Sequence, residues 1–176
     1  MYKINISSRT LHFLRPAGTS RGVYTTRKSY YVTLSDTNQP DVVGIGECAT
    51  LPDLSCDAMT DEEYEQKLRS FCDDFCHTGI INIDAMRPYP SMLFGLETAK
   101  AQLDVKGSIN FFNTAFGRGE EGITINGLVW MGTFDEMYQR LETKLKAGFR
   151  CVKLKIGAID FEKELDLIRH IRQAFT

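Results

Sequence analysis

Hydrophobic positions at the start of the chain follow the two-residue period of β-strands. Apolar and polar residues alternate over 2–6, which predicts a strand with one buried face. Residues 9–14 either extend this strand or pair with it, and 15–28, rich in Gly, Thr, Ser and Arg, are expected to form a long loop. Aromatic and β-branched residues predict a strand over 29–35. Another is predicted over 42–47, where two glycines let a second backbone approach.

The period then changes to that of α-helices. Thr60 and Glu63 have the spacing of a capping box, and apolar residues recur behind them on one helical face as far as a stop at Gly79. A second helix is predicted from near Ser91 to the basic last turn and glycine at 106–107. Strands followed by helices indicate an α+β unit in this part of the chain.

From residue 108 onward, strands and helices alternate. A strand is predicted over 123–131, and a helix with its own capping box and glycine stop over 133–148. A second strand follows over 151–156, and a last helix begins at Asp160, which can cap it. The order β-α-β-α with short connections requires a parallel sheet covered by helices.

Composition and charge exclude several classes of partner. The 176 residues contain 21 Lys and Arg against 23 Asp and Glu, and this net charge of −2 gives no reason to expect nucleic acid or an anionic membrane as a partner. No run approaches the roughly 18 apolar residues of a membrane span, and the N-terminus does not resemble a secretory signal. Five cysteines, an odd number at irregular spacing, indicate free thiols in a reducing cytoplasm.

Some residues that can carry chemistry fit structural roles better. Cys72 and Cys76 lie four apart on a predicted helix, but no second ligand pair follows at zinc spacing, so core positions are expected. The glycines of 117–122 have a dinucleotide-binding spacing, yet a strand rather than a helix follows them, which favours a loop. Trp130, on an apolar strand, is expected in the core.

Two lysines interrupt the apolar pattern of the strand at 151–156. Because side chains alternate along a strand, Lys153 and Lys155 share one face and the apolar residues share the other. One interpretation is a strand with a solvated face. The other is a face that lines a barrel near the carboxyl ends of its strands, where barrel active sites lie. There, repulsion between two ammonium groups would favour the neutral amine on one lysine, which could then act as a base.

These pieces together resemble the enolase superfamily, whose members pair an N-terminal α+β capping domain with a modified (β/α) barrel. Gly44-Ile45-Gly46-Glu47-Cys48, followed by Leu51-Pro52, is similar to the family's glycine–glutamate segment, and Lys153-Leu154-Lys155 to the Lys-x-Lys motif of its second barrel strand. The loop 15–22 most resembles that of the o-succinylbenzoate synthases of menaquinone biosynthesis. Dipeptide epimerases and N-acylamino acid racemases share the lysine motif. The resemblance implies a capping domain over 1–107 and the first two β/α units of an incomplete barrel over 108–176.

The resemblance also implies a Mg²⁺-dependent carbon–oxygen lyase. Lys155 would remove the proton alpha to the carboxylate of a small-molecule substrate. Lys153 would favour the neutral amine of Lys155 by charge repulsion and would add positive charge near the enolate. In the synthase reaction, syn dehydration converts 2-succinyl-6-hydroxy-2,4-cyclohexadiene-1-carboxylate to 2-succinylbenzoate. Arg21, Leu51 and Pro52 would close over the barrel mouth and contribute to substrate selection.

The metal site is expected outside this chain. The family's metal ligands are acidic residues on the third to fifth barrel strands, so no metal ligand is assigned here, and Glu47 and Asp104 are expected to be structural. A complete (β/α)₈ barrel needs about 250 residues, far more than follow residue 107. We therefore expect the chain to require the missing C-terminal half of the barrel and to be inactive alone. The alternative is a short capping or interaction module, and the sequence predicts no oligomeric state.

Overall fold

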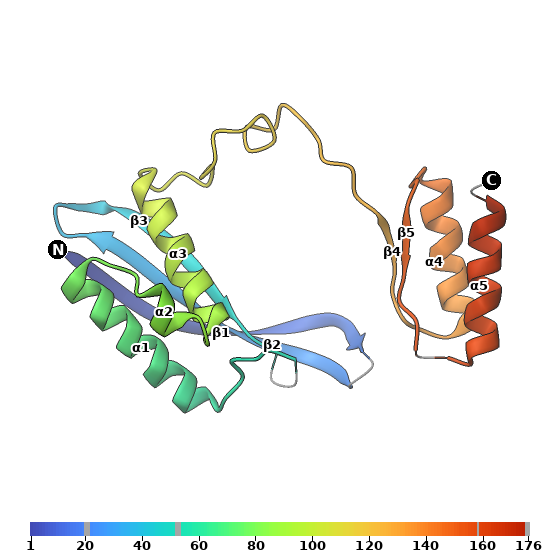
Figure 1. Ribbon diagram of the computed structural model, residues 1–176, viewed down its shortest axis with the longest axis horizontal. Helices are drawn as coiled ribbons and strands as arrows, with labels where there is room; N and C mark the ends of the chain where they lie inside the picture. The colour runs from blue at the N-terminus through green and yellow to red at the C-terminus, as the bar shows by residue number, and fades with distance from the viewer. Residues whose placement is uncertain (20–21, 52–53, 158, 175–176) are drawn as a thin grey trace. The chain divides into compact units, whose positions relative to one another are not determined.

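The computed structural model describes residues 1–19, 22–51, 54–157 and 159–174 (Figure 1). The chain divides into two compact units. The first comprises Met1–Leu14 and Thr26–Glu121, and the second comprises Arg15–Thr25 and Gly122–Thr176. Each unit has its own buried core.

The first unit is built on a three-stranded sheet in the order β1-β2-β3, although the end of β1 from Arg15 and the start of β2 up to Thr25 belong to the second unit. Its strands are β1 (Tyr2–Gly18), β2 (Val23–Asp36) and β3 (Gln39–Ala49). Strands β2 and β3 run antiparallel, with Tyr30 opposite Cys48. The predicted strands over 2–6, 29–35 and 42–47 are therefore confirmed.

The prediction of a loop over 15–28 is wrong, because β1 continues to Gly18 and β2 begins at Val23. Residues 9–14 extend the first strand. All side chains from residue 7 to residue 16 are exposed, so this part of β1 has no buried face. The described residues of 15–28 are exposed or half-buried, so the polar composition that indicated a loop instead belongs to strand residues that lie outside the core.

Helices cover one face of this sheet (Figure 1). They are α1 (Asp61–Thr78), α2 (Ile83–Met86) and α3 (Pro90–Asp104), and the short α2 was not predicted. The capping box of Thr60 and Glu63 is present, and Gly79 ends α1 with a left-handed φ of 71°. The core between helices and sheet consists of Tyr30, Val32, Leu34, Cys48, Tyr64, Leu68, Cys72, Phe75, Met86, Met92, Leu96 and Ala99.

Helix α3 packs directly on β3, backbone against backbone. A Cβ atom built on Gly44 would collide with the carbonyl of Ala99, and one built on Gly46 would collide with the backbone of Gly95. The two glycines of β3 therefore permit the close approach that the sequence predicted.

The second unit contains two β/α pairs. Strand β4 (Gly127–Val129) is followed by α4 (Phe134–Lys146), and β5 (Val152–Leu154) by α5 (Phe161–Ala174). Both strands are shorter than predicted. Their parallel ladder pairs the three residues of β4 with the three residues of β5. The capping box of α4 is present, and the Asp160 carboxylate accepts a hydrogen bond from the Glu162 backbone at the start of α5. The core consists of Val129, Met137, Leu141 and Leu167.

None of the helices in the described residues is long and apolar enough to cross a membrane.

Candidate active site

The carboxyl ends of β4 and β5 lie at the same edge of the second unit's sheet. The register pairs Gly127 with Val152 and Val129 with Leu154, and the backbone N–H of Lys155 continues the ladder by donating to the Val129 carbonyl at 3.1 Å. Trp130 and Lys155 are each the first residue beyond their strand. Parallel pairing therefore places these two residues side by side at the edge where α/β proteins bind ligands.

Alternation along β5 separates Lys153 from the core, but the predicted alternation does not continue beyond the strand, since Lys155 is half-buried and Ile156 is exposed. Val152 and Leu154 pack against the core formed with α4 and α5. Lys153 lies between them in sequence and is exposed, so it occupies the opposite face of the strand. The predicted alternation is confirmed for these three positions.

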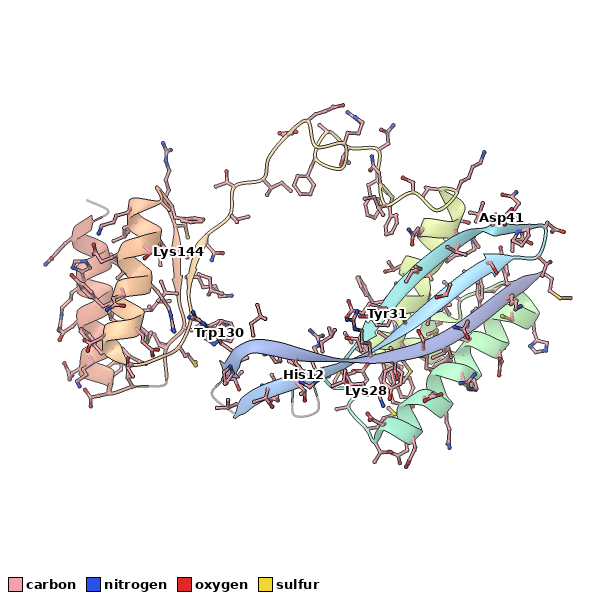
Figure 2. The ribbon with its side chains drawn as sticks, turned by 180° about the vertical axis from the view of Figure 1, so that it is seen from behind. His12, Lys28, Tyr31, Asp41, Trp130 and Lys144 are labelled. Atoms are coloured by element: carbon pink, nitrogen blue, oxygen red, sulfur yellow. The ribbon has the colours of Figure 1, made fainter. Side chains whose placement is uncertain are left out.

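The ammonium group of Lys155 lies against an aromatic ring. Its Nζ is 5.8 Å from the centroid of the Trp130 ring, within the range of a cation–π contact. The indole Nε1 of Trp130 donates a hydrogen bond of 2.9 Å to the carbonyl of Gly18, which belongs to the same unit. The expectation that Trp130 is a core residue is wrong, because 37% of the residue is exposed and its indole Nε1 donates a hydrogen bond. Trp130 is labelled in Figure 2. Sequence reasoning missed this residue, since an apolar strand position does not reveal which lysine lies beside it.

Arg140 of α4 holds the segment that follows β4. Its Nη1 donates to the carbonyls of Trp130 at 3.0 Å and Met131 at 2.9 Å. Glu136 lies 3.6 Å from the Arg140 guanidinium, and hydrogen bonds from Thr133 lower the pKa of the Glu136 carboxyl. The turn is tightly filled, since a Cβ on Gly132 would come within 2.7 Å of Glu136 Oε2.

The turn after Lys155 is held in a similar way. Gly157 has a φ of 99°, a conformation that favours glycine, and its N–H donates to the Glu164 carboxylate at 2.6 Å. Glu164 belongs to α5 and is only 4% exposed. The backbone on the C-terminal side of Lys155 is thus tied to a buried side chain of the following helix.

The other predicted site residues are not brought to this edge by any described contact. Leu51 lies in the first unit and is half-buried, and its N–H donates to Ser55 Oγ at 3.0 Å. Arg21 and Pro52 lie outside the described residues. Asp104 forms an ion pair with Lys100, one helical turn away in α3.

The first unit contains a cavity of about 660 Å³ that sequence reasoning missed. Glu47, Arg27 and Asp57 contribute to its lining. Asp57 is 3% exposed and accepts a hydrogen bond of 2.8 Å from the Ser91 backbone. Within the described residues, the buried Nε of Arg27 has no hydrogen-bond partner. Glu47 belongs to the glycine–glutamate segment that the sequence singled out, but Arg27 and Asp57 join it only through tertiary packing, and no sequence signal marks those two residues.

The described residues do not fit a Mg²⁺ site. Within them, no group of three or more His, Cys, Asp and Glu side chains could hold a metal ion. Magnesium prefers carboxylate oxygens and water, and the candidate edge presents two lysines and an indole instead. Cys72 is buried, and desolvation raises the pKa of its thiol to about 12, which keeps the thiol protonated near neutral pH.

Comparison with known proteins places the chain among relatives of known activity, although no protein-family model matches it. Its sequence is 35% identical to an o-succinylbenzoate synthase from Desulfotalea psychrophila over 195 aligned positions, covering 94% of this chain and 52% of that protein. The fold is similar to the crystal structure of MenC from Desulfotalea psychrophila, with a TM-score of 0.70 and 27% identity over 99% of this chain and 54% of that one.

Two solved structures of lower identity share the fold. An enolase family member from Agrobacterium tumefaciens with homology to dipeptide epimerases, bound to sodium and L-Ala-L-Glu, gives a TM-score of 0.70 at 18% identity, covering 99% of this chain and 51% of that one. The o-succinylbenzoate synthase from Thermosynechococcus elongatus, complexed with Mg in its active site, gives a TM-score of 0.61 at 22% identity. The match covers 99% of this chain and 48% of that one. The chain therefore spans about half the length of the proteins that it matches.

Proposed function

Because the chain belongs to the enolase superfamily, we propose that it carries the general base of an o-succinylbenzoate synthase reaction. The observation that carries this proposal is the position of Lys155, half-buried at the carboxyl edge of a parallel sheet. Among the described residues no carboxylate forms a salt bridge with Lys155, so its nitrogen is available to a substrate.

The proposed chemistry needs one lysine in two protonation states. The neutral amine of Lys155 takes the proton from the carbon alpha to the substrate carboxylate, which leaves an ene-diolate. The electron pair then expels the hydroxyl group of the ring, and the Lys155 ammonium returns the proton so that water leaves. The ring becomes aromatic, and one molecule of water is lost overall. Lys153, exposed two residues before Lys155, contributes positive charge that favours the ene-diolate.

We assign the metal of this reaction to residues other than those described. In enzymes of this kind Mg²⁺ stabilises the ene-diolate. The described residues do not fit such an ion, and the chain spans about half of its relatives. We propose that the ligands lie on later barrel strands and that the 176 residues alone have no activity. Arg21, Leu51 and Pro52 are proposed to contact the carboxylate substrate. The five free cysteines favour a cytoplasmic protein.

The test is turnover by the complete protein encoded with these residues. Incubation with 2-succinyl-6-hydroxy-2,4-cyclohexadiene-1-carboxylate and Mg²⁺ should give 2-succinylbenzoate. Lys155→Ala should lower the rate by about 100- to 10,000-fold, the usual contribution of a general base. Lys163→Ala, which changes an exposed lysine of α5, is the matched control and should leave the rate unchanged. Full activity of the Lys155 variant would refute the assignment of the base.

A dipeptide epimerase is the second candidate. The fold similarity to the Agrobacterium tumefaciens structure, with its bound L-Ala-L-Glu, is as high as that to the MenC structure. Rapid epimerisation of dipeptides, measured as exchange of the alpha proton in deuterated water, without any dehydration would favour this candidate. Lys155 would remain the proposed base in that case, because both reactions begin by removing a proton alpha to a carbonyl group.

A further inference from the structure

Trp130 lies at the edge of the second unit's sheet, and the proposed reaction assigns no role to its side chain. Trp130 is the sole tryptophan of the chain, and its indole contacts two different segments. We propose that Trp130 is a positioning residue that fixes the amine of Lys155 and the backbone at Gly18 against a single indole ring. This inference deepens the proposed function and rests on it where it concerns turnover.

The backbone of Trp130 is fixed on both sides. The carbonyl of Val129, the residue before it, accepts from the Lys155 N–H, and the carbonyls of Trp130 and Met131 accept from Arg140. The Cα atom from which the indole projects is therefore held by β5 and α4 together. A rigid origin of this kind is what a positioning side chain requires.

The indole itself is fixed at its polar edge. Its Nε1 can only donate a hydrogen bond, and it does so to the Gly18 carbonyl at 2.9 Å. With the edge of the ring held there, the Lys155 Nζ lies 5.8 Å from the ring centroid. The side chain is partly exposed, so the contact lies at the surface of the unit, where a substrate could reach it.

An indole is well suited to hold a lysine that must act as a base. A carboxylate at this place would accept a hydrogen bond from the ammonium and stabilise its protonated form. The face of an indole also attracts a cation, but more weakly than a carboxylate does, and it carries no lone pair that accepts a hydrogen bond from the ammonium. In the part of the chain that the structure describes, the Trp130 ring is the one side chain shown in contact with the Lys155 ammonium. The nitrogen is thus oriented while its proton remains free to move to a substrate.

The sole tryptophan makes this contact measurable without any turnover. A nearby ammonium quenches and shifts indole emission, so Lys155→Met in the 176-residue chain should brighten and shift the fluorescence of Trp130. Lys155→Arg keeps a cation at the ring and should leave the emission close to that of the unmodified chain. Lys153→Met, which removes an exposed lysine two residues away, is the matched control and should change nothing. Circular dichroism confirms that each variant is folded.

Two results of the fluorescence experiment overturn the proposal. The first is identical emission from the folded Lys155→Met variant and the unmodified chain. The second is an equal change caused by Lys153→Met, which would reflect overall charge rather than contact.

The consequence for turnover is tested in the complete protein. Trp130→Leu removes both the ring face and the donor, and should lower kcat by about 10- to 100-fold with little change in KM, as misplacement of a catalytic group does. Trp130→Phe keeps a ring face and should recover part of kcat. An unchanged kcat in Trp130→Leu would refute the positioning role. If the complete protein turns over neither candidate substrate while the fluorescence result holds, the proposed function fails and the Trp130–Lys155 contact stands.

Discussion

Burial divides four of the five cysteines into two chemical classes, and the fifth, Cys76, is intermediate. Cys48 and Cys72 lie in the first core, where desolvation raises the pKa of each thiol to about 12. Cys56 and Cys151 are exposed. The thiolate is the form that reacts with alkylating agents, so a raised pKa keeps the two buried thiols protonated and unreactive near neutral pH.

This division predicts the pattern of alkylation. At pH 8, iodoacetamide should modify Cys56 and Cys151 rapidly and leave Cys48 and Cys72 largely unmodified, as measured by mass spectrometry of peptides over time. Because the raised pKa lies well above pH 8, a further rise to pH 9 should not expose the buried pair. In concentrated urea all four should react at similar rates. Labelling of Cys48 in the folded chain as fast as Cys151 would contradict its place in the core.

At the scale of elements, the packing of α3 on β3 depends on the absence of side chains. A Cβ built on Gly95 of α3 would collide with the Sγ atom of Cys48 in β3. Glycine is otherwise unfavourable inside a helix, by about 1 kcal/mol relative to alanine. Its presence at this buried position is explained by the approach of the two backbones.

Gly95→Ala should therefore destabilise the first unit in spite of its better helix propensity. We expect a net loss of about 1–3 kcal/mol in the free energy of unfolding, the usual cost of overpacking, measured by circular dichroism in urea. Glu97→Ala, an exposed change in the same helix, is the control and should alter stability little. In a Cys48→Ala background the colliding sulfur is gone, so Gly95→Ala should cost less. Equal costs in both backgrounds would show that the collision is not the cause.

At the scale of the whole molecule, the sequence predicted the features that depend on interactions between residues close together in the chain. The capping boxes at Thr60 and Thr133 and the glycine stop at Gly79 are interactions within a few residues, and all three are present. The strand through 15–18 was missed because its residues, two exposed and two half-buried, lack the alternation that burial of one face imposes. The contact of Trp130 with Gly18 was equally hidden, since it joins residues 112 positions apart. The Lys-x-Lys spacing indicated the lysine face, but only the parallel register placed an indole beside it.

The two separate cores make a prediction about unfolding of the whole chain. The sole tryptophan lies in the second unit, so its fluorescence reports that unit alone. Leu141 and Leu68 are both fully buried, the first in the core of the second unit and the second in that of the first. Replacing either with alanine should cost about 2–5 kcal/mol in the unit that contains it. In urea, Leu141→Ala should lower the midpoint of the fluorescence transition. Leu68→Ala should leave this midpoint in place while it lowers the transition seen by circular dichroism. A fluorescence midpoint that moves equally in both variants would mean that the two cores unfold as one.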